Sequence, residues 1–312
     1  MPFFLFFDKI TMVNDMQEHI DEFINYLTFE KKYSDNTIEN YIKDLNLFSD
    51  FIKTRHINYQ NIDYSRVSSY LIYLNDLKYS SSSINRHLSS IRSFYEFMLN
   101  RKVVSSSPFK LVHGPKKEKK LPNYLKYSEF EDLVNTCDET ALGIRNRMIL
   151  ELLFATGVRV SEAVNIKLTD IDFKECEIKI IGKGKKMRIV YFNQVCKKVM
   201  SEYVLNARNE LLKGKKSEYL LLNHLGNKLT RRGIQDILEK LIKKSSIKHK
   251  ISPHTLRHTF ATLLLNEGMD IREVQELLGH ERLSTTSIYT HVSNEELRRI
   301  YLQNHPRAHK KE

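Results

Sequence analysis

Three stretches of the first hundred residues carry apolar side chains at the spacing of an α-helix, and this pattern most limits the possible folds. In the first stretch, the run Ser34-Asp-Asn-Thr37 is typical of a helix N-cap. The apolar positions that follow, on one face of a 3.6-residue repeat, are Ile38, Tyr41, Ile42, Leu45, Phe48, Phe51 and Ile52. Because an apolar face must be buried, the stretch predicts a helix within a packed bundle.

Two further helices are expected from the same pattern. One carries Val67, Tyr70, Leu71, Leu74 and Leu77. The other starts near the serines at 80–83 and carries Ile84, Leu88, Ile91, Phe94, Tyr95 and Met98. The opposite face of this last helix presents Arg86, His87 and Arg92. We expect the apolar stripes to form a core and the polar faces to be available for ligand contacts.

A segment that breaks helices follows at residues 105–122. It contains Pro108, Gly114, Pro115 and Pro122, and the basic run Lys116-Lys117-Glu118-Lys119-Lys120. Proline and glycine interrupt helices, and like charges extend a chain, so the segment is predicted to link two domains. It is either a solvated tether or a segment that lies along a phosphate backbone.

The second part of the chain mixes helices with a little sheet. Residues 177–181 and 187–192 are predicted to be two strands of a hairpin, joined by Gly182-Lys-Gly-Lys-Lys186. Residues 219–222 are a third candidate strand, and the chain from Thr230 onward is expected to be mainly helical. The predicted fold class is therefore mainly α with a small β-sheet or hairpin (α+β).

The formal net charge is +12. Such a balance favours a polyanionic partner, since each lysine or arginine placed on a phosphate releases condensed counterions. The alternative is a protein that is merely basic.

Cysteine content and hydropathy indicate a compartment. Cys137, Cys176 and Cys196 are too few and too scattered for a disulfide framework or a thiolate metal site, which fits a reducing compartment. The apolar run at residues 2–7 is shorter than a signal-peptide core of about 7–15 residues, and no stretch approaches the ~20 apolar residues of a membrane span. We expect a cytoplasmic protein without a membrane association.

Four segments of the second part carry residue types suited to a phosphate group. They are residues 155–162 with Arg159, the hairpin turn with Lys183, Lys185, Lys186 and Arg188, residues 253–258 with His254 and Arg257, and residues 277–280 with His280, followed by Tyr289. In the first segment, Gly157 is expected to end one helix and Ser161 to lie near the start of the next. Each signal alone is weak, because surface arginines, lysines and tyrosines are common.

A metal site is the alternative reading of the third segment. His254 and His258 are spaced i, i+4, as in zinc-binding helices. The segment lacks the glutamate of the metalloprotease motif and a nearby set of further ligands, so we predict no metal and no other cofactor.

Taken together, the four segments resemble the tyrosine recombinase family, also called the phage integrase family, and specifically its bacterial Xer recombinases. The family's ordered signature is Arg, Lys, His-x-x-Arg, His, Tyr. It maps onto Arg159, Lys183, His254 with Arg257, His280 and Tyr289. The boxes ATGVRVSE, GKGKKMRIV, HTLRHTFAT, LLGH and YTHV occur in the family's order, and the closing HPRA lies at residues 305–308.

The resemblance covers residues 15–308 and implies an organisation into domains. Residues 15–104 are expected to form a helical, SAM-like core-binding domain that contacts DNA, and residues 123–302 a mixed catalytic domain. The basic linker spans 105–122, and residues 303–312 form a C-terminal tail. Residues 1–14 are left as an N-terminal extension, with Met12 as an alternative start.

The resemblance also implies a mechanism. Tyr289 is the nucleophile and forms a 3′-phosphotyrosyl link to DNA, with His254 as the base. Arg159, Arg257 and His280 bind the phosphate, Lys183 is the general acid, and Glu162 holds the cations in place. Further DNA contacts are expected from Lys116, Lys117, Lys119, Lys120, Lys185, Lys186 and Arg188. Neither ATP nor a metal is required.

The implied partners are a double-stranded recombination site, a second Xer recombinase in a cyclic heterotetramer, and an FtsK-type translocase. The implied role is resolution of chromosome and plasmid dimers. Alternatives are a mobile-element integrase, a type IB topoisomerase and a non-catalytic DNA-binding regulator. The final helix, with Leu297, Ile300 and Tyr301 on one face, is expected to pack either on a neighbouring subunit or on its own domain.

Overall fold

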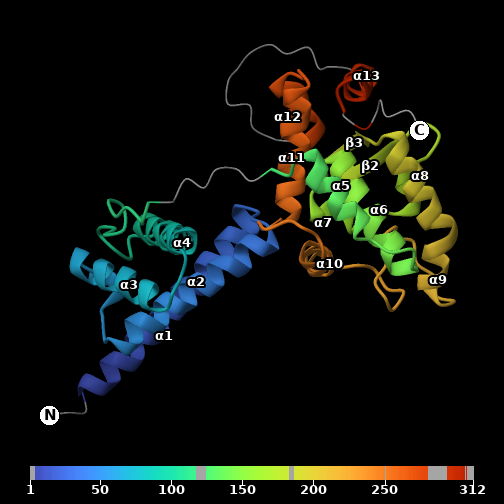
Figure 1. Ribbon diagram of the computed structural model, residues 1–312. Coiled ribbons are helices and arrows are strands. Elements are labelled where there is room, and N and C mark those ends of the chain that lie inside the picture. Colours follow the sequence, from blue (N-terminus) through green and yellow to red (C-terminus); the bar gives the residue numbers. More distant parts are fainter. Residues whose placement is uncertain are drawn as a thin grey trace. The chain divides into compact units, whose positions relative to one another are not determined.

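The computed structural model describes residues 4–116, 124–182, 186–249, 251–279, 294–305 and 307, with side chains from residue 15 onward. The chain divides into two compact units, Met1–Lys119 and Lys120–Glu312. The described part of the first unit is helical, and that of the second combines helices with a three-stranded sheet (Figure 1). The predicted α+β class is confirmed.

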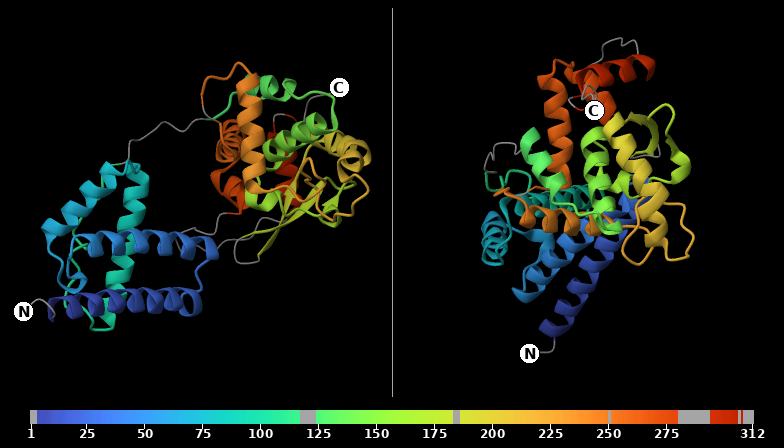
Figure 2. Two further views of the ribbon diagram at one scale, coloured as in Figure 1. Left: turned by 90° about the horizontal axis from the view of Figure 1, so that it is seen from below. Right: turned by 45° about the vertical axis from the view of Figure 1, so that its right-hand side comes forward.

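The first unit is a bundle of four α-helices within its described residues. They are α1 (Phe4–Asn25), α2 (Asp35–Thr54), α3 (Tyr64–Asp76) and α4 (Ser81–Asn100), with short turns η1 (Tyr26–Glu30) and η2 (Tyr59–Asn61). Helices α1 and α2 run side by side (Figure 2). The N-caps fall where the sequence predicts them, because Ser34 precedes α2 and the Ser80 hydroxyl accepts from the Ser83 N–H. Helix α1 begins at Phe4, before residue 15, where the helical domain was expected to start.

The apolar stripes form the core of this unit. The α4 stripe is buried at every predicted position, and Phe48 of α2 packs edge-on against Tyr70 of α3. Two expectations are wrong. Leu77 is 46% exposed, because α3 ends at Asp76 and Leu77 is its C-cap. His87 is buried, because it turns toward the buried carboxylate of Asp44, 3.2 Å away.

The first half of the predicted linker packs against α4 and is not a tether. Phe109 and Val112 are buried, and the Arg92 guanidinium donates to the carbonyl oxygens of both. Asn85 donates to the carbonyl of Pro115 at 2.9 Å. Residues 105–115 therefore belong to the helical unit, and the basic run starts where this packing ends.

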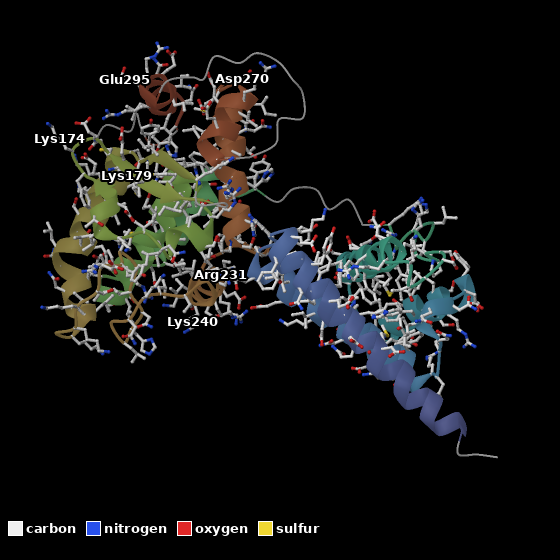
Figure 3. The ribbon with its side chains drawn as sticks, turned by 180° about the vertical axis from the view of Figure 1, so that it is seen from behind. Lys174, Lys179, Arg231, Lys240, Asp270 and Glu295 are labelled. Atoms are coloured by element: carbon white, nitrogen blue, oxygen red, sulfur yellow. The ribbon has the colours of Figure 1, made fainter. Side chains whose placement is uncertain are left out.

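The second unit is built around α6 (Ala141–Thr156), which is buried along most of its length. The remaining helices are α5 (Tyr127–Asn135), α7 (Val160–Ala163), α8 (Gln194–Glu202), α9 (Arg208–Leu212), α10 (Arg231–Lys244), α11 (Pro253–Asn266), α12 (Ile271–Leu278) and α13 (Asn294–Asn304), with short turns η3 (Leu168–Asp170) and η5 (Tyr203–Ala207). Helices α8 and α11 both pack on α6. Asp270 and Glu295, at the starts of α12 and α13, lie at one end of the unit, and Arg231 and Lys240 of α10 lie at the other (Figure 3).

The sheet contains the predicted hairpin. Strands β1 (Ile171–Asp172), β2 (Glu177–Ile181) and β3 (Met187–Tyr191) are antiparallel in the order β1-β2-β3. The hairpin is confirmed, with β3 ending one residue before Phe192. The third predicted strand is wrong, since residues 219–222 take part only in isolated bridges, Lys167↔Tyr219 and Leu222↔Lys228.

Helix α13 packs on its own unit, one of the two arrangements that the sequence left open. Leu297 and Tyr301 are buried, and the Tyr301 hydroxyl donates to the carbonyl of Ala155 at 3.0 Å. Beyond α13, the guanidinium of Arg307 forms a buried ion pair with Glu151 of α6. Burial lowers the pKa of nearby His305 to about 4, so this imidazole is neutral at physiological pH.

None of the described helices combines the length and apolar character that a membrane span would need.

Candidate active site

The turn between α6 and α7 positions the first arginine. Gly157 has φ +58° and caps α6, as predicted, and a Cβ at this position would lie 2.4 Å from the Phe260 ring. Glycine is therefore required both by backbone conformation and by space. The chain then turns so that Arg159 is the N-cap residue of α7 and Glu162 its third residue.

Glu162 binds two guanidiniums. Its Oε1 accepts from Arg159 Nη1 at 3.0 Å and its Oε2 from the Arg159 backbone N–H at 2.8 Å. Arg188 of β3 donates to both oxygens, at 3.0 and 2.8 Å. Burial alone would raise the pKa of Glu162, but the hydrogen bonds from Arg188 and Arg159 outweigh it and hold the pKa below its ordinary value. Glu162 is therefore an anion that fixes two cations.

Arg257 of α11 lies beside this pair and is buried. Its Nη1 donates to the carbonyl of Gly157 and its Nη2 to that of Leu278, each at 2.6 Å. Burial, and then the charge of Arg159, lower the pKa of Arg257 to about 10. The guanidinium still carries its charge at neutral pH.

The C-terminus of α12 is the point at which the two arginines meet. Arg257 binds the carbonyl of Leu278, and Arg159 Nη2 lies 3.5 Å from the carbonyl of Gly279. Gly279 caps α12 with φ +65°. Its neighbour in the sequence is His280, so the two guanidiniums hold the backbone that leads into the next residue of the signature.

His254 occupies the first turn of α11 and is exposed. Ser252 caps the helix through the Thr255 N–H, and Pro253 is its first residue. His254 is three residues before Arg257, so the two lie on neighbouring positions of one helical face. Among the described residues, no group of three or more His, Cys, Asp or Glu is arranged to hold a metal ion.

Several predicted residues lie outside the described residues. They are Lys117, Lys119, Lys120, Lys183, Lys185, His280 and Tyr289. Lys116 and Lys186 are described and exposed.

Arg188 has a position that the sequence analysis missed. It was predicted to contact DNA, but its side chain is 16% exposed and its guanidinium is bound to Glu162. The signal was present in the strand alternation, since Arg188 lies two residues before Val190, whose side chain is buried on the same face.

The three cysteines are free and buried. Burial raises the pKa of the Cys137 thiol to about 11, so it is not a thiolate at neutral pH. The three arginines beside Glu162, namely Arg159, Arg188 and Arg257, are thus the best candidate for chemistry in the described part of this unit.

Comparison with known proteins shows the family to which the chain belongs. A model of the phage integrase family matches residues 123–296, and a model of the phage integrase N-terminal SAM-like domain matches residues 20–102. Tyrosine recombinase XerC of Anoxybacillus flavithermus is 48% identical over 290 residues, covering 92% of this chain and 97% of the relative. Tyrosine recombinase XerC of Bacillus subtilis is 41% identical over 303 residues, covering 96% of this chain and 100% of the relative.

A solved structure gives the same result at the level of the fold. The crystal structure of a XerH site-specific recombinase bound to its difH substrate, before cleavage, has a TM-score of 0.63. It is 25% identical, covering 85% of this chain and 76% of that chain.

Fold, site and relatives define an enzyme that breaks and rejoins DNA strands, and the chain belongs to the phage integrase family of tyrosine recombinases. Within the family its place is in the Xer subfamily. General likeness of the linker and the tail predicts XerC rather than XerD, and the relatives named XerC confirm this.

Proposed function

We propose that this recombinase cuts its DNA site through a covalent bond between Tyr289 and a 3′-phosphate, and that it resolves chromosome and plasmid dimers into monomers before cell division. The class of reaction follows from the family. The roles of individual residues are assigned from their places in the family signature and from the chemistry that each position allows.

One observation carries the proposal: two guanidiniums from distant segments converge at the end of α12. Arg257 contacts the carbonyl of a residue 100 positions earlier, Gly157, and Arg159 is held next to it by Glu162. A guanidinium presents planar donors and remains charged. The remaining N–H donors of the pair suit the non-bridging oxygens of a scissile phosphate, on which charge develops during attack.

The nucleophile needs help, because a free tyrosine has a pKa near 10. We assign His254 as the base that takes the phenolic proton of Tyr289 and later returns it. Its exposed position at the start of α11, beside Arg257, leaves it accessible to a DNA backbone.

The leaving 5′-oxygen needs a proton, which we assign to Lys183 on the hairpin turn. His280, which follows Gly279 in the sequence, is assigned as a further donor to the phosphate; Arg159 contacts the Gly279 carbonyl. The P–O bond to the 5′-oxygen breaks as the bond to the tyrosine oxygen forms. The product is a phosphotyrosyl ester and a free 5′-hydroxyl, and a hydroxyl from the same or a partner strand reverses the step without ATP.

The assembly is also proposed. A second Xer recombinase completes a cyclic tetramer on two duplexes, and an FtsK-type translocase controls it in the cytoplasm. Lys116, Lys117, Lys119, Lys120, Lys185 and Lys186 are assigned to phosphate contacts. The exposure of Lys116 and Lys186 supports this assignment.

The test begins with the DNA site. Tyr289→Phe protein is incubated with a random-sequence duplex library, and the bound fraction is sequenced. The enriched duplex is then nicked beside each candidate scissile phosphate, so that the released 5′-hydroxyl fragment diffuses away. We expect wild-type protein to form a covalent protein–DNA product on a denaturing gel and Tyr289→Phe to form none. Trapping by Tyr289→Phe would refute the chemistry. So would no trapping by wild type on a duplex that it binds, with the partner recombinase also present, and this second result would leave a DNA-binding regulator.

A second assay separates the related activities. Two copies of the enriched site are placed on one supercoiled plasmid, with the partner recombinase added. Deletion of the DNA between two identical sites is expected. Relaxation without deletion would instead identify a topoisomerase, and no reaction between the two identical sites would leave a mobile-element integrase that joins two different sites.

A further inference from the structure

Arg188 connects three segments that each lead into a residue of the proposed site. Its guanidinium binds Glu162, which holds Arg159. A Cβ on Gly182, the residue before Lys183, would lie 3.4 Å from Arg188 Nη1. A Cβ on Gly279, the residue before His280, would lie 2.9 Å from Arg188 Cδ and 3.0 Å from its Nε.

These contacts place the Arg188 side chain between the base of the hairpin and the end of α12. Both neighbours are glycines, and in each case the arginine occupies space next to the position of the missing side chain. Gly279 has a positive φ as well, so an alanine there meets both strain and a collision. Arg188 therefore connects β3, and with it the base of the hairpin, to the Glu162 carboxylate that orients Arg159.

The charges around Glu162 also favour a fixed position for Arg188. Arg159, Arg188 and Arg257 bring three positive charges around one carboxylate, Glu162, and Arg159 and Arg188 both lower the pKa of Arg257. The Arg188 guanidinium satisfies both oxygens of Glu162 in a two-point arrangement, which fixes orientation as well as distance. A lysine supplies one point charge and does not reproduce this geometry.

We propose that Arg188 is a positioning residue for the reaction: it fixes the base of the hairpin at Gly182, the residue before Lys183 in the sequence, relative to Glu162 and the phosphate-binding arginines, and it does not itself bind DNA. The inference rests on the proposed function, since it takes Lys183 as the general acid. It replaces the expectation that Arg188 is one of the DNA contacts.

The test compares Arg188→Gln and Arg188→Lys with Lys179→Gln. Lys179 is exposed on β2 (Figure 3) and is paired with Ile189, whereas Arg188 is paired with Ile180. The two side chains thus lie on opposite faces of the sheet, and the control removes the same charge. We expect Arg188→Gln to slow single-turnover cleavage of the nicked duplex by about tenfold or more, the effect of removing the hydrogen-bond partners of ligands in metal sites. The rate of Arg188→Lys should lie between those of wild type and Arg188→Gln. Affinity for the intact duplex should stay within about twofold of the control.

A modified substrate tests the link to Lys183 directly. When sulfur replaces the bridging 5′-oxygen, the leaving group departs without a proton from a general acid. We expect this duplex to restore most of the rate lost in Arg188→Gln. The double variant Arg188→Gln, Glu162→Gln should cleave no more slowly than the slower of the two single variants, because both substitutions break the same contact between Arg188 and Glu162.

The outcomes are distinct. Wild type that traps no DNA contradicts the proposed function. If wild type traps DNA, equal rates for Arg188→Gln and Lys179→Gln overturn the inference, as does a loss of affinity equal to the loss of rate, or a failure of the sulfur substrate to restore cleavage. Thermal melting of each variant, with Arg188→Lys as the milder change, separates these results from unfolding.

Discussion

Removal of Arg307 should destabilise the second unit strongly. The side chains of Glu151 and Arg307 are 2% and 9% exposed, and their ion pair is supported by a hydrogen bond from Arg307 Nε to the Tyr127 hydroxyl at 3.1 Å. Arg307→Met leaves the Glu151 carboxylate buried without its cation. Breaking a buried pair from one side costs about 3–5 kcal/mol.

Loss of both members of the ion pair should have the opposite effect to loss of Arg307 alone. Replacing both partners by apolar residues, Glu151→Leu with Arg307→Met, removes the desolvation cost together with the attraction. The double variant should therefore recover most of the loss. Scanning calorimetry of the full chain measures both. In a unit of this size 1 kcal/mol shifts the Tm by roughly 2–4 °C, so the single variant should melt roughly 6–20 °C lower.

The control is Arg299→Met. Arg299 also pairs with a carboxylate, Glu296, but at a site where the two side chains are 63% and 48% exposed, and such pairs contribute little. A Tm for Arg307→Met within about 2 °C of this control would refute the burial argument. So would a double variant that melts below the single one.

Two further predictions concern the α6–α7 turn. The pKa of Glu162 is lowered in the folded state, so the ionised carboxylate stabilises the fold at pH values above its ordinary pKa of 4.5, and this stabilisation is lost as the pH falls through the folded-state pKa. In thermal melts from pH 7 to pH 3, the Tm difference between wild type and Glu162→Gln should therefore narrow below about pH 4.5. A Tm difference that widens there would contradict the lowered pKa. Gly157→Ala should lower the Tm more than Gly214→Ala. Both glycines have a positive φ, which costs an alanine about 1–2 kcal/mol, but of the two only Gly157 has a group, the Phe260 ring, in the way of a Cβ. Equal shifts would show that the ring moves aside without cost.

Local signals in the sequence were sufficient for three helices of the first unit, for the hairpin and for the order of the signature. The apolar repeat of α4, the Ser34 and Ser80 caps and the glycine at the end of α6 depend on a few neighbouring residues, and the structure has them where they are predicted. The hairpin is equally local. The strand predicted at residues 219–222 failed because strand formation depends on a partner, and the chain offers it only isolated bridges.

Contacts between distant residues were decided by the tertiary structure. His87 lies on the polar face of its helix and Arg188 follows the basic hairpin turn, so both were expected to face a ligand, yet each turns inward toward a buried carboxylate, Asp44 or Glu162. Residues 105–115 have the composition of a linker, but Arg92 binds their carbonyls and packs them on α4.

The sequence by itself determined three helices of the first unit, the hairpin, the family and the residue types of the site. Only the tertiary structure decided that α13 packs on its own unit and that Glu162 joins Arg159 to Arg188. The physical reason is that helix periodicity and capping are short-range, whereas a buried charge must find its partner wherever the fold brings one within hydrogen-bonding distance.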